Sequence, residues 1–398
     1  MVLEGSPLVT PKGRGQSGQR VLRVLHVVEN LHTQAIENWL LRMLRIVSQE
    51  RPDHHWSFFC ILGERGGLDD AFRQLGATVI HSTYPMTRKR PFLAALRQVM
   101  KDGKYDILHC HHDIVSAIYL LASIGLPFRQ RIVHVHNTSI AMLTSNRIKA
   151  ALFRAPMRQI CLCMADKVVG VSADALNAML ANHSPRPNRD LVVHCGINTS
   201  AFSSRVPEPA AVRHALGLPL CARLLLFVGR MDAYKNPLFI LEILKHLPAL
   251  EPSIVALFAG TGPLEEELSR LAKAASLEKR IRVIGFRDDI PRLMQASDLL
   301  VWPSIEKPKE GLGLGIVEAQ TAGLPVLMSR SVPVDAIVVP ELVNVLPLAA
   351  GPEAWAEATL EILNRPHPPR SESLARVEAS SFSLAKGVSN LMALYEGV

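Results

Sequence analysis

The sequence has 398 residues, of which 48% are hydrophobic and 20% charged, and its formal net charge is +8. This composition is typical of a soluble globular protein with enough apolar residues for two domain cores. No run of about 18 uncharged apolar residues occurs, which argues against a membrane span.

Residues 1–20 lack a basic segment followed by an apolar stretch and a small-residue cleavage site, so they do not resemble a secretory signal. Their Gly, Ser, Pro and basic content predicts a disordered lead-in. The six cysteines are scattered and form no CxxC pair, which favours a reduced cytosolic protein and argues against a zinc site.

Positive charge is concentrated in the first half of the chain, in residues 87–90, 128–131 and 146–158. In the last of these segments, Arg and Lys alternate with Ile, Leu, Phe and Met. This pattern fits either a helix on an anionic membrane surface or a solvated amphipathic helix. Nucleic acid is disfavoured as a partner, because aromatic residues make up only 5% and no nucleic-acid-binding motif is present.

Short apolar runs rich in β-forming residues alternate with helical patterns, which predicts parallel sheets covered on both faces. In the first half we expect strands at 21–28, 56–62, 77–82, 106–110, 131–136, 167–172 and 191–195. In the second half we expect strands at 223–229, 253–260, 281–286, 298–304 and 324–330.

Residues 197–212 contain Pro and Ser but few large apolar residues, so we place a linker between the two series of strands there. The predicted fold class is therefore α/β, with two Rossmann-like domains whose parallel sheets face each other across a cleft. In such sheets ligands bind outside the carboxyl ends of the strands, and the loops after the strands are the places to look for chemistry.

One such loop is EGLGLGIVEAQ, residues 310–320, between an expected strand and a helical run. It does not have the spacing of a dinucleotide-binding turn, and neither does GTGPLE at 260–265. It does predict a flexible turn whose backbone N–H groups at a helix start would favour a phosphate. Glu310 in the loop and Glu318 in the helix could accept hydrogen bonds from sugar or ribose hydroxyls, or could be plain loop and surface charges.

A second loop is FVGRMDAYKNP, residues 227–237. Arg230 ends an expected strand, and Lys235 follows shortly before a helix that Pro237 opens. Two cations in one loop can hold a diphosphate and neutralise it as a leaving group. As an isolated pair they could equally be ordinary solvated charges.

The GR-x4-K element followed by E-x7-E resembles the family 4 retaining glycosyltransferases of the GT-B fold. Residues 21–44, 258–272 and 283–304 resemble the same family, and the similarity extends over nearly the whole chain from about residue 21. The nearest subgroup is that of the EpsF-like capsular and exopolysaccharide transferases. The resemblance implies an acceptor domain at 21–200, a nucleotide-sugar domain at 201–378, and a C-terminal helix at 379–398 that crosses back to the first domain.

For the donor, the resemblance implies that Arg230 and Lys235 hold the diphosphate and Glu318 the ribose hydroxyls. The backbone of Gly311, Leu312, Gly313 and Leu314 would reach phosphate and sugar, and the main chain at Arg287 would meet the nucleobase. No DxD triplet occurs, so no metal is expected at the diphosphate. The co-substrate would be a UDP- or GDP-sugar, with no further cofactor.

For the reacting centre, the resemblance implies that His136 and Glu310 orient and stabilise the sugar. His111 would face the acceptor. Where the family usually has a Gly-Gly pair near the donor phosphates, this chain has Gln34 and Ala35, which we assign to the acceptor side. Side chains there would crowd a close backbone approach.

The leading hypothesis is therefore metal-independent sugar transfer, with retention, to a lipid-linked or polysaccharide acceptor in exopolysaccharide, capsule or envelope glycan synthesis. The protein would be cytoplasmic, or peripheral at the inner face of the plasma membrane. Two alternatives stay open. One is a nucleotide-sugar 2-epimerase of the same fold, and the other is a non-catalytic relative that binds nucleotide sugar.

Overall fold

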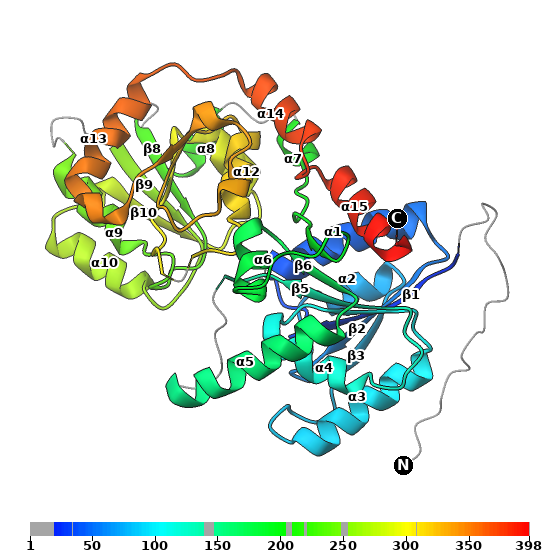
Figure 1. The fold of residues 1–398 in the computed structure, drawn as a ribbon. Helices are drawn as coiled ribbons and strands as arrows, with labels where there is room; N and C mark the ends of the chain where they lie inside the picture. The colour runs from blue at the N-terminus through cyan, green and yellow to red at the C-terminus, as the bar shows by residue number, and fades with distance from the viewer. Residues whose placement is uncertain are drawn as a thin grey trace, which may run out of the picture. The chain divides into compact units, whose positions relative to one another are not determined.

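The computed structural model describes residues 20–33, 35–138, 147–203, 209–218, 221–247, 254–307 and 309–397. These residues form two parallel sheets, each with helices packed on it (Figure 1). The chain divides into two compact units. The first contains residues up to Cys110 and Tyr119–Arg131, and the second contains His111–Ile118 and the residues from Ile132 onward.

The first sheet has seven strands in the order β3-β2-β1-β4-β5-β6-β7. They are β1 (Arg23–Val28), β2 (His55–Cys60), β3 (Thr78–His81), β4 (Ile107–Cys110), β5 (Gln130–Val135), β6 (Lys167–Gly170) and β7 (Asp190–Val192). The residues of the inner strands and of β2 are mostly buried, as expected for parallel strands covered on both faces, whereas the edge strands β3 and β7 are mostly partly exposed. The strand order changes direction between β1 and β4, which pair in parallel, and open sheets bind ligands at the carboxyl ends of strands at such a point.

The helices that accompany this sheet are α1 (Ala35–Glu50), α2 (Asp69–Gln74), α3 (Lys89–Gly103), α4 (Ser116–Ala122), α5 (Arg147–Met164) and α6 (Ala173–Leu180), with the 3₁₀ helix η1 (Asp113–Val115) before α4. Helix α1 forms because its apolar residues recur at helical spacing. Its buried residues include Trp39, Leu40, Met43, Leu44 and Val47. Glu37 is buried on the same helix.

The second sheet has six strands in the order β10-β9-β8-β11-β12-β13, and all neighbouring strands pair in parallel. They are β8 (Arg223–Val228), β9 (Ile254–Ala259), β10 (Ile281–Gly285), β11 (Leu299–Trp302), β12 (Val326–Met328) and β13 (Val343–Val345). Here the order changes direction between β8 and β11. The loops after these two strands therefore emerge side by side.

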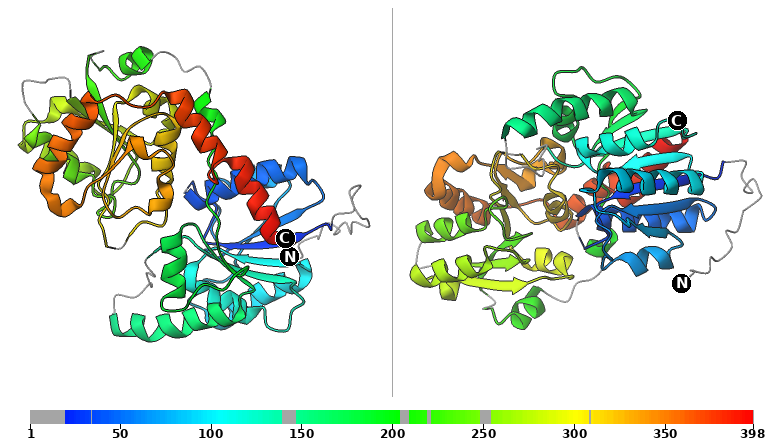
Figure 2. Two further views of the ribbon diagram at one scale, coloured as in Figure 1. Left: turned by 45° about the horizontal axis from the view of Figure 1, so that its top comes forward. Right: turned by 90° about the horizontal axis from the view of Figure 1, so that it is seen from below.

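The remaining helices are α7 (Ser200–Ser203), α8 (Pro209–Ala215), α9 (Leu238–His246), α10 (Glu265–Ala274), α11 (Ile290–Ala296), α12 (Leu314–Thr321), α13 (Gly351–Asn364), α14 (Arg370–Ala379) and α15 (Leu384–Glu396). Four further 3₁₀ helices are η2 (Glu278–Arg280), η3 (Val334–Ala336), η4 (Pro340–Leu342) and η5 (Leu348–Ala350). Two further views show the strands of the second sheet, from green to orange, running side by side among these helices (Figure 2).

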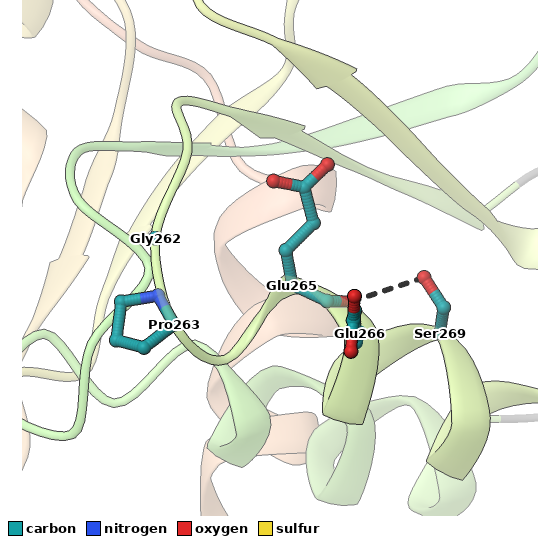
Figure 3. Close-up of a pocket in the computed structure, with 5 residues that line it drawn as sticks. All are labelled: Gly262, Pro263, Glu265, Glu266 and Ser269. Carbon is teal, nitrogen blue, oxygen red and sulfur yellow. Dashed lines mark hydrogen bonds between the residues drawn. The ribbon is translucent and has the colours of Figure 1, made fainter.

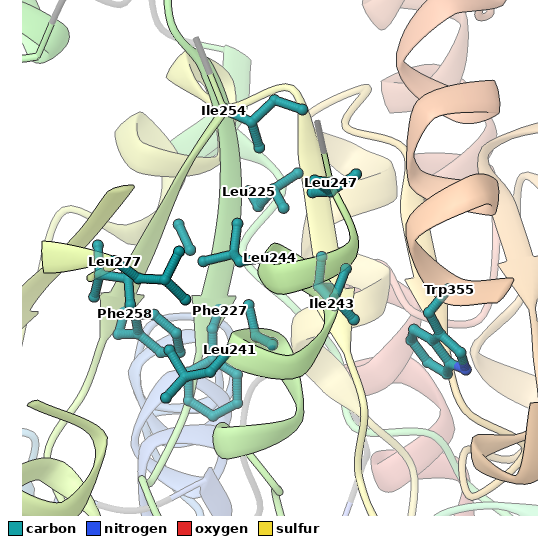
Figure 4. Close-up of a cluster of buried hydrophobic side chains, with 14 of the residues drawn as sticks. Leu225, Phe227, Leu241, Ile243, Leu244, Leu247, Ile254, Phe258, Leu277 and Trp355 are labelled. Carbon is teal, nitrogen blue, oxygen red and sulfur yellow. The ribbon is translucent and has the colours of Figure 1, made fainter. Parts of the chain in front are cut away.

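The core of the second sheet lies between its strands and helices α9 and α13 (Figure 4). Phe227 and Phe258 from neighbouring strands meet Leu241 and Leu244 from α9. Trp355 of α13 is fully buried against the same cluster, and its indole N–H donates to the carbonyl of Pro347 (3.1 Å). This packing anchors β8 and α9, which are the two elements that the loop at 229–237 connects.

All twelve predicted strands are present, with ends within a few residues of those expected, and the predicted α/β class with two parallel sheets is confirmed. Strand β13 was not predicted. The segment 197–212, where we placed the linker, contains α7 and the start of α8. Most of the expected lead-in lies outside the described residues. No described helix combines the length and the low polarity that a membrane span requires.

Candidate functional site

The loop between β8 and α9 carries the two predicted cations. Asp232 organises this loop, because its carboxylate accepts from the amide of Lys235 (2.9 Å) and its backbone carbonyl accepts from the amide of Asn236 (3.0 Å). Arg230 is 3.7 Å from Asp232, and its side chain is 74% exposed. Its guanidinium is therefore available to an anionic ligand at the carboxyl end of β8.

Lys235 instead turns to Glu310, in the loop after β11. The Lys235 ammonium lies 2.8 Å from the Glu310 carboxylate. The other carboxylate oxygen accepts from the Trp302 indole (2.5 Å) and from the Ser304 hydroxyl. The ammonium also lies 4.3 Å from the centre of the Trp302 ring. Glu310 is only 3% exposed, and such a buried carboxylate is stable because a cation and two donors surround it.

The alternating glycines of residues 310–315 allow the backbone to pass where no side chain fits. A Cβ on Gly311 would overlap the carbonyl oxygen of His136. Gly313 caps α12 with φ of 86°, in the left-handed region that glycine adopts without strain. The predicted helix start is thus present, and its first N–H groups follow directly on the Glu310 loop.

Two further residues that the resemblance assigns to the donor are Glu318 on α12 and Arg287 after β10. Glu318 is half-buried in the second turn of α12. Arg287 follows β10, and its guanidinium makes a two-pronged pair with Asp289 at 2.8 and 2.7 Å. The hydrogen bonds from Arg287 hold the pKa of Asp289 below its ordinary value. The guanidinium is thus paired within its own loop.

His111 and His136 lie directly after β4 and β5, and the structure brings them together as a hydrogen-bonded pair. His111 Nδ1 and His136 Nε2 are 3.1 Å apart. The amide of His136 donates to Asp113 (2.8 Å), and the side-chain amide of Asn137 donates to the same carboxylate (2.9 Å). Burial lowers the pKa of His136 to about 3, so the ring is neutral at physiological pH. A neutral ring can orient a substrate through its N–H donor or its acceptor nitrogen, but it does not serve as a general acid at that pH.

Two family models match the chain side by side. Residues 8–201 match the Glycosyltransferase Family 4 model, and residues 211–378 match the model of Glycosyl transferases group 1. The chain belongs to the family 4 glycosyltransferases of the GT-B fold. The resemblance read from the GR-x4-K and E-x7-E motifs is thereby confirmed.

Curated relatives of this glycosyltransferase include EpsF of Bacillus subtilis, to which glycosyltransferase activity is assigned provisionally. The two are 25% identical over 89% of this chain and 92% of EpsF. An Escherichia coli UDP-Gal:α-D-GlcNAc-diphosphoundecaprenol α-1,3-galactosyltransferase is 28% identical over 70% of this chain and 73% of its own. A D-inositol 3-phosphate glycosyltransferase of Mycolicibacterium paratuberculosis is 28% identical over 74% and 67%.

Solved structures show the same fold at low sequence identity. Anabaena HepE in complex with UDP has a TM-score of 0.73 at 17% identity, covering 95% of this chain and all of HepE. Its complex with UDP-glucose has a TM-score of 0.72. Sucrose-phosphate synthase of Thermosynechococcus elongatus has a TM-score of 0.73 at 18% identity, covering 94% of this chain and 98% of its own.

Two residues that donate hydrogen bonds to Glu310 were not singled out from the sequence. Trp302 and Ser304 were counted only as part of a strand, although both donate to Glu310. The sequence signal for these contacts was an indole and a hydroxyl near the end of a strand that is followed by the E-x7-E motif.

Glu37, in the first turn of α1, is 5% exposed, and burial raises its pKa to about 7. Of the two residues in place of Gly-Gly, Gln34 lies outside the described residues and Ala35 is the exposed first residue of α1.

An open pocket at the start of α10 contains none of the predicted residues. It is lined by Gly262, Pro263, Glu265, Glu266 and Ser269 (Figure 3). The Ser269 hydroxyl donates to the backbone carbonyl of Glu265 (3.1 Å). Two carboxylates at its mouth make this pocket a poor place for a diphosphate, so we do not assign the donor phosphates to it.

Proposed function

We propose that this glycosyltransferase moves a sugar from a UDP- or GDP-sugar to a lipid-linked or polysaccharide acceptor with retention of anomeric configuration. The observation that carries the proposal is the pairing of Lys235 with Glu310 at the carboxyl ends of the adjacent strands β8 and β11, with the exposed Arg230 in the same loop as Lys235. HepE, which has the same fold, binds UDP and UDP-glucose, and the E. coli relative acts on a lipid diphosphate acceptor.

In this proposal Arg230 and Lys235 bind the donor diphosphate and neutralise the charge that grows on the leaving group. Glu310 holds the Lys235 ammonium in place, and we also assign it to the donor sugar, which would share a carboxylate that already accepts from Lys235, Trp302 and Ser304. No metal is assigned to the diphosphate, since two cations and the start of α12 supply positive potential there. The backbone from Gly311 to Leu314 meets phosphate and sugar.

The nucleoside is held farther out. Glu318 accepts hydrogen bonds from the ribose hydroxyls, and the main chain at Arg287 meets the base. The side chain of Arg287 is already paired with Asp289, which supports a role of the backbone rather than of the guanidinium.

At the reacting centre, His136 orients the sugar through a hydrogen bond. In the same-face route to retention that we propose, the acceptor oxygen bonds to the anomeric carbon as the bond from that carbon to the diphosphate oxygen breaks, and the departing phosphate oxygen takes the proton of the acceptor hydroxyl. The neutral state of His136 supports this division of roles, since a ring with a pKa of about 3 is not an acid at neutral pH. His111, Gln34 and Ala35 are assigned to the acceptor.

We further assign residues 21–200 to the acceptor domain, 201–378 to the donor domain, and 379–398 to a helix that returns to the first domain. The cytoplasmic protein would meet the membrane through α5. On this helix Leu152 and Phe153 are 68% and 51% exposed, next to the exposed Arg154. Exposed apolar residues beside a cation suit an anionic lipid surface, where a lipid-linked acceptor in glycan synthesis would lie.

The proposal is tested in two steps. Thermal-shift screening of nucleotide sugars should identify a donor that raises the melting temperature, because a ligand of the folded state stabilises it. Incubation of that donor with a polyprenyl-diphosphate sugar should then release the nucleoside diphosphate, and NMR should show a product with the donor's anomeric configuration. Activity that persists in EDTA supports metal independence.

Other results would favour the alternatives. An epimerised sugar formed without acceptor would favour a 2-epimerase. Tight donor binding without turnover, unchanged when Gln34 and Ala35 are both replaced by Gly, would favour a non-catalytic relative. If no nucleoside diphosphate or nucleotide sugar binds at all, the proposal is wrong.

A further inference from the structure

The three histidines at the end of strands β4 and β5 gather their ring nitrogens at one place. His134 is the second-last residue of β5, His136 follows that strand, and His111 follows β4. Because side chains two apart on a strand point to the same face, His134 and His136 lie side by side. Their rings stack with centres 4.4 Å apart, and the His111 ring is 5.5 and 5.4 Å from them.

The nitrogens are close to the spacing of a metal site. One nitrogen from each of His111, His134 and His136 lies within 4.8 Å of the other two. His111 Nδ1 and His136 Nε2 are already 3.1 Å apart. Histidine nitrogens bind zinc at about 2.0–2.1 Å in a tetrahedral arrangement, which places neighbouring ligand atoms roughly 3.3 Å apart. The wider gaps would need to close by at most about 1.5 Å. The stacked His134 and His136 rings would also have to turn so that their nitrogens converge on the ion.

We propose that His111, His134 and His136 form a binding site for a transition-metal ion of the Zn²⁺ or Co²⁺ kind. Three imidazoles without a carboxylate or water cage select such ions over Mg²⁺ and Ca²⁺, which prefer oxygen ligands. The fourth position is left for water or for an oxygen of a substrate.

The surroundings suit such an ion. His111 and His136 keep 6% and 8% of their surface exposed, whereas His134 is fully buried, so the ion enters from the side of the strand ends. Asp113 fixes the end of β5 through the amide of His136, which limits how far that ligand can move. Anchoring of this type around the ligands is what holds a metal site in shape.

This histidine site differs from the proposed diphosphate site at Arg230 and Lys235, both in the ion it would bind and in the effect of that ion on transfer. A metal that assists a diphosphate is an oxygen-binding ion such as Mg²⁺, and none is assigned there. A Zn²⁺ ion on His136 and His111 would instead occupy the nitrogens assigned to sugar and acceptor. If the proposed function holds, micromolar Zn²⁺ would therefore inhibit transfer. The binding test below uses no sugar donor, so its outcome does not depend on that function.

The test is a titration of the tag-free full chain with Co²⁺, whose visible absorption reports four-coordinate nitrogen ligation. The wild type should bind one Co²⁺ per chain, displaced by Zn²⁺ but not by excess Mg²⁺. His111→Asn and His134→Asn should each weaken binding by about ten-fold or more, since each removes one ligand. His246→Asn is the matched control, because His246 is exposed at the end of α9 and should leave binding unchanged.

Melting temperatures without metal show whether each variant folds. Should the variants fail to fold, zinc X-ray absorption on the wild type decides the question without them, with three imidazoles per Zn²⁺ expected. Fewer than three imidazoles would overturn the proposal. So would a wild type that binds no Co²⁺, or folded His111 and His134 variants that bind as tightly as the His246 control.

Discussion

Lys235 and Glu310 are 75 positions apart in the chain, yet their side chains form an ion pair of 2.8 Å. The pair exists because β8 and β11 are neighbours in the second sheet, so the loops that follow them meet. It places a cation and a carboxylate together, and the exposed Arg230 lies in the same loop as Lys235. If the donor diphosphate binds there as proposed, the positive charge is in place before charge develops on the leaving group.

Lys235→Ala should lower kcat/KM by about 10² or more, because a charge-assisted contact to the leaving group strengthens in the transition state. Steady-state kinetics with the donor found by screening would measure this. Lys245→Ala is the control, since Lys245 pairs with Glu242 on the surface of α9 and should have normal activity. Near-wild-type turnover of the Lys235 variant would show that Lys235 does not bind the donor diphosphate.

Glu318→Ala should weaken the binding of the free nucleoside diphosphate by about ten-fold or more, because the ribose hydroxyls would lose a charged acceptor. Isothermal titration with UDP and GDP gives the dissociation constants. Glu357→Ala on the exposed side of α13 serves as the control. An unchanged dissociation constant would exclude Glu318 as the ribose ligand.

Gly311→Ala should destabilise the fold by roughly 1–3 kcal/mol, the usual cost of forcing extra atoms into a packed position. The added methyl group would overlap the carbonyl oxygen of His136, and a backbone atom cannot rotate away. Urea unfolding would measure the loss. Gly67→Ala is the comparison, because Gly67 is exposed and has space for a methyl group. Equal stabilities of the two variants would contradict the close approach.

Glu37→Gln should stabilise the protein above neutral pH. Burial raises the folded-state pKa of Glu37 from 4.5 to about 7, so the folded state favours the protonated form. Its contribution to stability is full below pH 4.5 and is lost as the pH rises from there through 7. The gain of the variant over wild type should grow across this window and reach at most roughly 3 kcal/mol.

Denaturant unfolding between pH 4 and 8.5 would measure this difference. Glu50→Gln, at the exposed end of the same helix, should show no such trend. A gain for Glu37→Gln that does not depend on pH would indicate that its carboxyl group is not held in the protonated form.

Most of the fold could be predicted from the sequence. Parallel strands buried on both faces are continuous apolar runs, so β8 and β11 were evident from local composition. Strand β13 has only three residues between 3₁₀ turns, and its burial pattern is mostly half-exposed, so it carried no local signal. The helices α7 and α8 were missed because Pro and Ser in 197–212 indicate a loop.

The α/β class, the cationic loop and the E-x7-E loop can be read from the chain alone, because hydrophobic pattern and motif spacing are local properties. The contacts between these two loops became visible in the three-dimensional structure. Strand order brought Lys235 to Glu310 and added the Trp302 indole and the Ser304 hydroxyl to the same carboxylate. It likewise gathered three histidines from two strands. Contacts between distant residues depend on which strands are neighbours in the sheet and in which register, and no local pattern in the chain encodes that.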